Sequence, residues 1–165
     1  MRRLFLFFIA ICLVSLCFSD DAEARRRRRR HRPRRAKIIN EKKLFERIGG
    51  AKAISEIVDE WIRLNLADQR VAQAFTPVTS KPEKLGKMRR NLNDQLCEIA
   101  DGPCQYKGSD MKKTHIALAV SEDQYLVVSD NLVRVLQARQ VSEREKNELL
   151  ARIGELRPEI VADTP

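Results

Sequence analysis

The chain has few of the residues from which metal sites are usually built. Histidine occurs only twice in 165 residues, and His31 lies inside a run of arginines, which leaves His115 as the one imidazole of the remaining chain. The four cysteines form neither a C-x-x-C-H stretch nor the Cys/His pairs of a structural zinc site, which argues against both kinds of site. Aromatic residues are scarce, and no strand pattern competes with the helical ones. These absences direct attention to a helical domain and to His115.

Long hydrophobic runs are nearly absent as well, since the only one extends from Leu4 to Phe18. It is too short to span a bilayer comfortably, which takes about 20 residues. Two arginines precede it, and the small-x-small sequence Ala22-Glu23-Ala24 follows. This order predicts a signal peptide over residues 1–24 that is cleaved on export to the bacterial periplasm or out of the cell. The alternative is an uncleaved segment that anchors the protein in the membrane.

The positive charge of the chain is concentrated in one segment. From Arg25 to Lys37, ten of thirteen residues are Lys or Arg, whereas residues 38–165 hold as many acidic as basic side chains. Such a block repels itself and buries no apolar surface, so we expect a disordered tail over residues 25–40. Its expected partner is a polyanion or the anionic lipid of the cell envelope. The alternative is a solvated linker.

Two cysteines remain after the predicted cleavage. Cys12 and Cys17 lie within the signal segment, whereas Cys97 and Cys104 lie seven residues apart in the mature chain. An isolated pair in an oxidising compartment favours one disulfide. Two buried free thiols are the alternative if the protein is cytosolic.

Residues 41–165 are predicted to form one all-α domain. Apolar residues recur at helical spacing over residues 44–48, 51–66, 82–100, 110–120, 121–140 and 142–158. Pro82 suits the first turn of its helix. The pairs Ser121/Gln124 and Ser142/Glu145 match the capping box that begins a helix.

His115 shares one side of its predicted helix with Met111 and Leu118. Across from it we expect an apolar wall, formed by Met88, Leu92 and Leu96 of the long helix and by the isolated Phe75. One imidazole that faces an apolar wall across a gap is what five-coordinate haem requires. The alternative is a core histidine whose nitrogens are satisfied by its neighbours.

Four stretches resemble, in order and spacing, those of group-I truncated haemoglobins. They are LFERIGGAKAI, LADQRVAQAF, DGPCQYKGSDMKKTH and LRPEIV, between Leu44 and Val161. The resemblance implies the truncated-globin fold, a two-on-two helical sandwich around non-covalently bound haem b. It implies His115 as the iron ligand and Phe75 as an aromatic lid. One glycine motif of the family matches at Gly49-Gly50, whereas in the second Asp101 stands where glycine is usual.

Two positions depart from the family on the distal side of the haem. Members often carry a tyrosine and a glutamine there, whereas the matching residues here are Ile62 and Leu92, which cannot donate a hydrogen bond. A lost charge-assisted bond costs about 1.5–3 kcal/mol, so oxygen should leave roughly tenfold to hundredfold faster. The polar groups left are Gln95, Asn91 and Trp61, of which Gln95 is the best candidate donor.

The resemblance and the apolar pattern together give a set of expected haem contacts. They are His115, Phe75, Met88, Leu92, Leu96, Tyr106, Met111, Leu118, Arg89 and Lys112. We expect Met88 to pack over the iron, with weak ligation as the alternative. Arg89 and Lys112 are expected to neutralise the propionates, although both also suit a solvated surface.

The function predicted from these residues is reversible binding of O2, NO or CO at a single proximal histidine. Nitric oxide dioxygenation would need a reductase and long-lived bound oxygen, and a peroxidase would need a distal acid–base group, which is not evident. We therefore favour a binding protein over an enzyme. The alternatives are a haem redox enzyme or electron carrier, and a haem-free helical adaptor tethered to the envelope by its basic tail.

Overall fold

The computed structural model describes residues 42–162, so the predicted signal peptide and arginine-rich tail lie outside the described residues. Every regular element within this range is a helix, which confirms the all-α prediction. No helix in this range is both long and apolar enough to cross a membrane.

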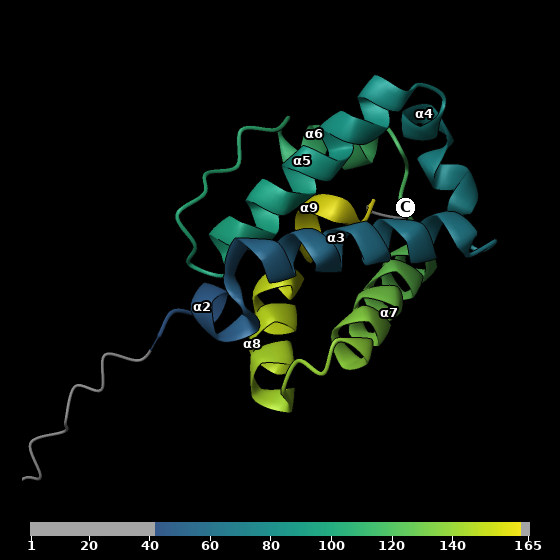
Figure 1. The fold of residues 1–165 in the computed structure, drawn as a ribbon. Helices are drawn as coiled ribbons and strands as arrows, with labels where there is room; N and C mark the ends of the chain where they lie inside the picture. The colour runs from purple at the N-terminus through teal and green to yellow at the C-terminus, as the bar shows by residue number, and fades with distance from the viewer. Residues whose placement is uncertain (1–41, 163–165) are drawn as a thin grey trace, which may run out of the picture. The chain divides into compact units, whose positions relative to one another are not determined.

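The described residues form a succession of long and short helices (Figure 1). In chain order they are α2 (Leu44–Ile48), α3 (Gly50–Ala67), the 3-10 helix η1 (Ala72–Phe75), α4 (Thr76–Thr79), α5 (Pro82–Ile99), α6 (Met111–Ile116), α7 (Glu122–Ala138), α8 (Glu143–Gly154) and α9 (Arg157–Ile160). The bounds of α3 and α5 lie within a residue of those expected from the apolar spacing. The short elements η1 and α4 were not expected.

The core forms around α3, which packs against α2, α5 and α7. Figure 1 shows α3 crossing the middle of the domain, with α5 on one side and α7 and α8 on the other. The fully buried apolar residues follow helical spacing on each element: Ile54, Ile57 and Val58 of α3, Leu132, Val135 and Leu136 of α7, and Leu149 of α8. Burial of each such side chain contributes about 1.5–3 kcal/mol, so this cluster is the main stabilising feature of the fold.

A buried polar cluster joins the end of α3 to α7. The Asn131 amide donates hydrogen bonds to Asn65 Oδ1 at 3.0 Å and to Asp68 Oδ2 at 3.4 Å. Arg70 also pairs with Asp68, and its hydrogen bond is the main cause that lowers the pKa of that carboxyl group well below the usual range. Because Asn65 and Asn131 are almost completely buried, these bonds are needed to offset their desolvation.

The end of α5 shows how the chain tolerates Asp101 in place of glycine. The helix ends in a Schellman motif, in which the Gly102 N–H donates to the Cys97 carbonyl at 2.7 Å. Asp101 has a left-handed φ of 61°, which short polar side chains accept more readily than most. Arg152 of α8 donates to the Asp101 carboxylate and to the Ile99 carbonyl, both at 2.7 Å. These contacts hold the turn closed.

The helix that carries His115 is shorter than the expected 110–120. α6 ends at Ile116, and a turn follows in which Ala119 has a φ of 47°. The predicted capping box then begins α7, since the Gln124 N–H donates to Ser121 Oγ and the Ser121 N–H donates to Gln124 Oε1. The reversal at Ala119 separates two elements that apolar spacing alone runs together.

The expected helix over residues 142–158 is divided, and its capping box is wrong. α8 ends at Gly154, and the separate short helix α9 follows. Ser142 makes no capping bond to the backbone. Its hydroxyl donates instead to the carboxylate of Glu145, which also accepts from Arg47 of α2. Arg47, which is distant in sequence, thus binds the Glu145 side chain that a capping box would use.

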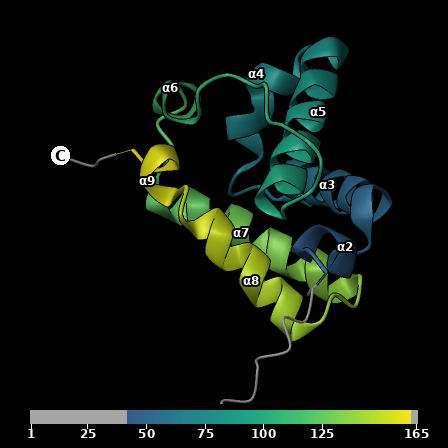
Figure 2. The ribbon, with the colours of Figure 1, turned by 90° about the vertical axis from the view of Figure 1, so that its left-hand side faces the viewer.

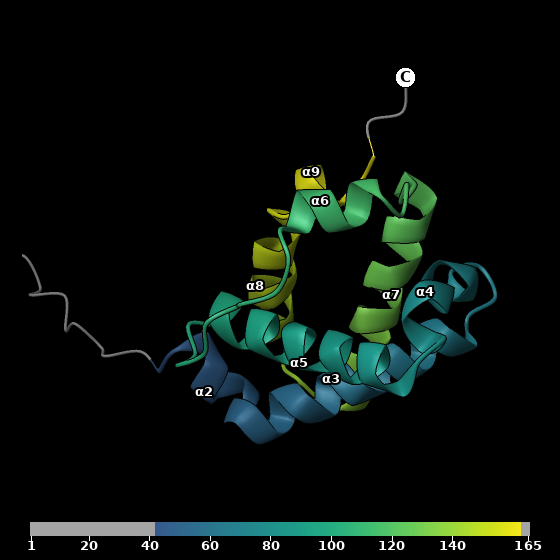
Figure 3. The same cartoon turned by 90° about the horizontal axis from the view of Figure 1, so that it is seen from above.

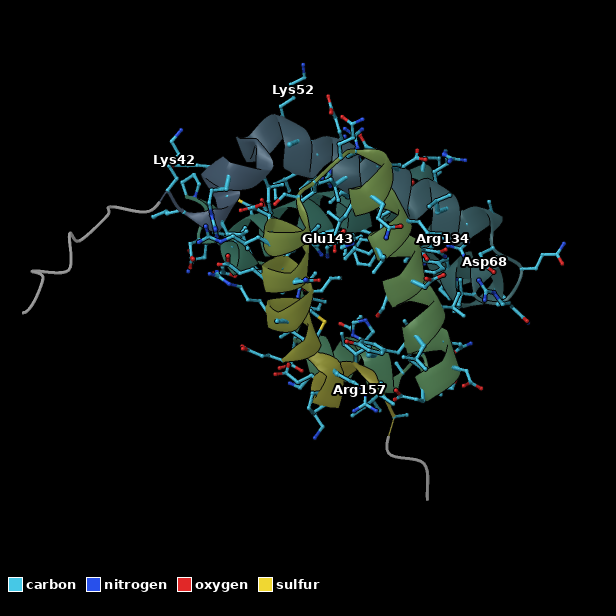
Figure 4. All side chains as sticks on the ribbon, turned by 90° about the horizontal axis from the view of Figure 1, so that it is seen from below. Lys42, Lys52, Asp68, Arg134, Glu143 and Arg157 are labelled. Atoms are coloured by element: carbon cyan, nitrogen blue, oxygen red, sulfur yellow. A yellow bond between two sulfur atoms is a disulfide. The ribbon has the colours of Figure 1, made fainter. Side chains whose placement is uncertain are left out.

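The long helices enclose the region in which the site was predicted. In Figures 2 and 3, α6 and α9 lie together at one edge of the domain, opposite α3 and α5. Figure 3 shows α7 and α8 on the two flanks, and no ribbon of the described residues crosses the middle. Charged side chains such as Lys52 of α3 point outward into solvent (Figure 4).

Candidate functional site

His115 has one ring nitrogen paired with the backbone and the other kept as a base. Its Nδ1 lies 2.8 Å from the carbonyl oxygen of Met111, one turn earlier in α6. A carbonyl oxygen can only accept, so in the neutral imidazole Nδ1 carries the proton and Nε2 keeps its lone pair. A hydrogen bond from the ring nitrogen that does not bind the metal is the means by which proteins orient a metal-binding imidazole. The half-buried ring is therefore prepared to ligate through Nε2.

The position of His115 depends on a helix of only six residues. Isolated helices of this length are unstable in water, so α6 needs support from its ends. Asp110 supplies it, because its carboxylate accepts from the Lys113 N–H and its carbonyl accepts from the Thr114 hydroxyl, both at 2.8 Å. Such a cap contributes about 1 kcal/mol. Packing against α9 adds to this support, and the Ala162 N–H donates to the Val120 carbonyl just beyond α6.

The predicted distal residues come from α3 and α5. Ile62 of α3 is buried, and Leu92 of α5 is half-buried against the core. Met88 lies one turn before Leu92 and is also half-buried. Leu96, expected as a haem contact, is only 3% exposed and belongs to the core cluster. The structure thus uses Leu96 for packing between protein side chains.

Trp61 and Gln95 were expected as hydrogen-bond donors on the distal side, and the structure places them differently. The indole Nε1–H of Trp61 donates to the backbone carbonyl of Val128 at 2.9 Å. An indole has a single donor, so Trp61 has none left for a distal ligand and that expected role is withdrawn. Gln95 is half-buried on α5, one residue before the core residue Leu96. With Asn91, which is also half-buried on α5, it is one of the two donors that remain of the expected set.

Arg89 has a protein partner in place of the expected propionate. Its guanidinium donates hydrogen bonds to both carboxylate oxygens of Asp59 on α3, and Nη2 also donates to Ser55 Oγ at 3.1 Å. The hydrogen bond from Arg89 to Asp59 is the main cause that lowers the pKa of the Asp59 carboxyl group. The pair joins α5 to α3, and it could not be predicted from the sequence because the partners lie thirty residues apart. Lys112 is exposed on α6 and stays a candidate for a propionate.

The remaining expected contacts come from η1 and from the chain in and around α6. Phe75 ends η1 and Met111 begins α6, and both are half-buried. The Tyr106 hydroxyl donates to the Ser109 carbonyl at 2.9 Å. Burial, with a smaller effect from the nearby Asp110 carboxylate, raises the pKa of Tyr106. Leu118, 39% exposed, keeps much of its apolar surface uncovered.

Two further exposed apolar residues, Ile116 and Leu126, were not among the expected contacts. Ile116 at the end of α6 is 58% exposed, and Leu126 in α7 is 53% exposed. With Leu118, they are the large hydrophobic side chains that the described part of the chain leaves exposed. No group of three or more His, Cys, Asp or Glu between residues 42 and 162 could hold a metal ion.

Comparison with known proteins places this arrangement in a family. Residues 43–162 match the family described as bacterial-like globin. A group 1 truncated hemoglobin of Nostoc sp. (strain MUN 8820) is 29% identical over 118 residues, which cover 72% of this chain and 96% of that protein. A group 1 truncated hemoglobin of Tetrahymena thermophila is 27% identical over 101 residues, or 61% and 79% of the two chains.

Solved structures share the fold. The Fe(III) form of the Tetrahymena pyriformis truncated hemoglobin has a TM-score of 0.66 at 23% identity and covers 73% of this chain and 99% of its own. The 2/2 hemoglobin from Synechococcus sp., solved in the cyanomet state with covalently attached heme, has a TM-score of 0.65 at 25% identity and covers 72% and 98%. Because the family match spans nearly all the described residues and these structures share the helical arrangement, the chain belongs to the bacterial-like globin family and has the truncated, two-on-two globin fold.

Proposed function

We propose that His115 ligates the iron of the haem in this globin and that the opposite side of the haem reversibly binds a diatomic gas, O2, NO or CO. The observation that carries the proposal is the hydrogen bond between His115 Nδ1 and the Met111 carbonyl, which leaves Nε2 as the coordinating atom. When bound, the haem iron supplies an open coordination position for the gas.

The side chains proposed to line the haem site suit a flat apolar group. Phe75, Met88, Leu92 and Met111 are half-buried, and Leu118 keeps exposed apolar surface that a porphyrin could cover. Most cofactor sites combine such an apolar lining with a few polar groups that fix the orientation. We assign Lys112 to a propionate, because Arg89 is engaged by Asp59.

We propose that the haem is haem b and is held without a covalent bond. The Synechococcus sp. hemoglobin was solved with covalently attached heme. In this chain, His115 is the sole histidine of residues 42–162 and is needed for the iron. The two cysteines of the same range are bonded to each other, and they do not form a C-x-x-C-H stretch.

The distal residues favour rapid release of oxygen. Ile62 and Leu92 have no donor, and Trp61 donates to Val128, so Gln95 is the best remaining donor for bound O2, with Asn91 as the alternative. Carbon monoxide depends less on such a bond, because it is less polarised on binding. We therefore propose that CO is favoured over O2 more than in a Tyr/Gln pocket, and that gas binding is a better description than nitric oxide dioxygenation, which requires long-lived bound oxygen.

Reconstitution with haem tests this function. Purified protein should bind one haem per chain and give an intense Soret band, and stopped-flow mixing of the ferrous form should show fast oxygen release. Absence of a Soret band would favour the haem-free adaptor instead. Slow oxygen release would contradict the apolar distal pocket, and the variant Gln95→Leu would then show whether Gln95 is the donor.

We also propose that the protein is exported and that its arginine-rich tail binds anionic envelope lipid or another polyanion. The support is the order of residues 1–24 and the charge of Arg25 to Lys37. Amino-terminal sequencing of protein expressed in a bacterial host tests export, with a mature chain expected to begin near Arg25. An intact N-terminus would favour the uncleaved anchor.

A further inference from the structure

The connection between α5 and α6 contains a disulfide. Cys97, buried in the last turn of α5, is bonded to Cys104, and their Cα atoms are 5.7 Å apart. This separation lies within the range of about 4.4–6.8 Å that disulfides require, so the pairing expected from the sequence is present. Residues 100–110, which contain Cys104, form neither helix nor strand. The bridge is therefore the covalent restraint on the chain that leads to His115.

The first half of this connection is tightly packed around the bridge. A Cβ atom on Gly102 would lie 2.5 Å from Cys97 Sγ and 2.7 Å from the Cys97 carbonyl oxygen, so only glycine fits there. The same Gly102 N–H closes the Schellman motif, and Arg152 binds Asp101 from α8. Close packing on both sides, against the disulfide sulfur and the end of α5, restrains the chain between the two cysteines while the bridge is intact.

The second half of the connection is hydrogen-bonded to α5 and to the residues just before α6. The backbone N–H of Tyr106 donates to the Glu98 carboxylate at 3.2 Å, and the Tyr106 hydroxyl donates to the Ser109 carbonyl at 2.9 Å. Ser109 is followed directly by Asp110, the residue that caps α6. A continuous series of bonds thus runs from the end of α5 to the first turn of the helix that bears His115.

We propose that the Cys97–Cys104 disulfide is a redox-sensitive brace that positions α6 and His115 for haem, so that its reduction weakens haem retention. The inference rests on the proposed function of His115. α6 packs chiefly on α9, so its position relative to α5 depends on the connection. The bridge roughly halves the non-helical connection that precedes Met111, from residues 100–110 to residues 105–110. Halving a flexible segment raises the effective concentration of its ends about threefold.

The redox step is ordinary thiol–disulfide exchange with a dithiol. Cys104 is the more exposed partner, so one thiolate of the dithiol attacks Cys104 Sγ and the Cys97 thiolate leaves. The second thiol of the reductant then attacks the reductant's first sulfur atom in the mixed disulfide, and the Cys104 thiolate leaves. The protein gains two electrons and two protons, and the dithiol becomes a cyclic disulfide.

The test measures haem loss from the reconstituted full chain to an excess of apomyoglobin, with and without dithiothreitol. We expect haem to leave about threefold faster from the reduced protein, since α6 is then less restrained. The iron–histidine stretching band in the resonance Raman spectrum of the ferrous form should shift or broaden. Far-UV circular dichroism should show the helical content retained.

The variant Cys97→Ser/Cys104→Ser is the matched control, because it retains Cys12 and Cys17. It should lose haem at the faster rate and show no response to dithiothreitol. Equal rates of haem loss and an unchanged iron–histidine band in oxidised and reduced wild type would overturn the brace while the proposed function stands. If neither form binds haem, the proposed function itself fails.

Discussion

α5 and α6 carry the residues proposed for opposite sides of the haem, yet the fold holds them in different ways. α5 has 18 residues, packs on α3, α4 and α8, and buries Leu96 and Cys97. α6 has six residues, packs chiefly on α9, and buries no residue completely. The distal wall is thus part of the protein core. The proximal side depends on a helix cap, a braced connection and, in our proposal, on haem.

This difference predicts unequal local stability. Elements with few buried apolar contacts open at a lower free energy than core helices. A ligand that binds only the folded form adds stability in proportion to its affinity and concentration. We therefore expect haem to stabilise α6 much more than it stabilises α5, because α6 has the less protein packing of its own.

The largest effect should come from removal of the proximal imidazole. His115→Ala should abolish stoichiometric haem binding, or leave a labile complex that added imidazole restores, because no other histidine lies in residues 42–162. Absorption titration with haem measures this outcome. His31→Ala removes the only other imidazole of the chain and is the matched control, with an unchanged Soret band expected. Normal spectra for His115→Ala would break the proposed division between α5 and α6.

A pair of leucine substitutions sharpens the contrast between framework and site. Leu132→Ala should lower the free energy of unfolding by about 2–5 kcal/mol, because the α7 side chain is 1% exposed in the core. Leu118→Ala should change it by less than about 0.5 kcal/mol in haem-free protein, since this side chain is 39% exposed. Urea denaturation of both variants, with and without haem, tests this. A large loss for haem-free Leu118→Ala would place Leu118 in the core.

A hydroxyl introduced on the distal side should slow oxygen release. Ile62→Tyr supplies the donor that Ile62 lacks, so we expect a decrease of roughly tenfold to hundredfold in the dissociation rate, equivalent to about 1.5–3 kcal/mol. Ile62→Phe adds similar bulk without the hydroxyl and should leave the rate closer to wild type. Stopped-flow measurements compare the three proteins. Equal slowing by both variants would indicate that bulk, not hydrogen bonding, controls release.

The smallest effect concerns the polar cluster that joins α3 to α7. The pKa of Asp68 is lowered in the folded protein, chiefly by Arg70, so its contribution to stability is present above the unfolded pKa of about 4 and is lost as pH falls through the lower folded value. Asp68→Asn should therefore be less stable than wild type at pH 6, and the difference should shrink at pH 3. Urea denaturation at the two pH values measures it. An equal difference at both would show that the carboxylate charge is not responsible.

Much of the framework could be predicted from the sequence, because its long helices bury one apolar face and so repeat that face in the chain. α3 and α5 follow this rule, and the α7 capping box is local to Ser121 and Gln124. The family stretches also indicated the residues that we propose for the site before their geometry was known. The sequence showed His115 as the single candidate ligand, and the structure added the carbonyl that sets its tautomer.

The features that were missed depend on contacts between distant residues or on backbone that no residue type reveals. Ala119 takes a left-handed φ without the glycine that usually signals one, so α6 was predicted too long. Arg89 and Trp61 were assigned to the haem, but Asp59 and the Val128 carbonyl bind them in the folded chain. Such pairings arise only when α3, α5 and α7 have been brought together.

The hydrogen bond from Trp61 to Val128 has a spectroscopic consequence. Trp61 is the only tryptophan of the chain, so its intrinsic fluorescence arises from one half-buried indole fixed between α3 and α7. The emission maximum therefore reports whether these two helices are docked. A haem bound within the same domain would accept the excitation energy and quench this emission. One optical signal, followed in the unmodified protein, thus distinguishes the unfolded chain, the folded haem-free domain and the haem complex.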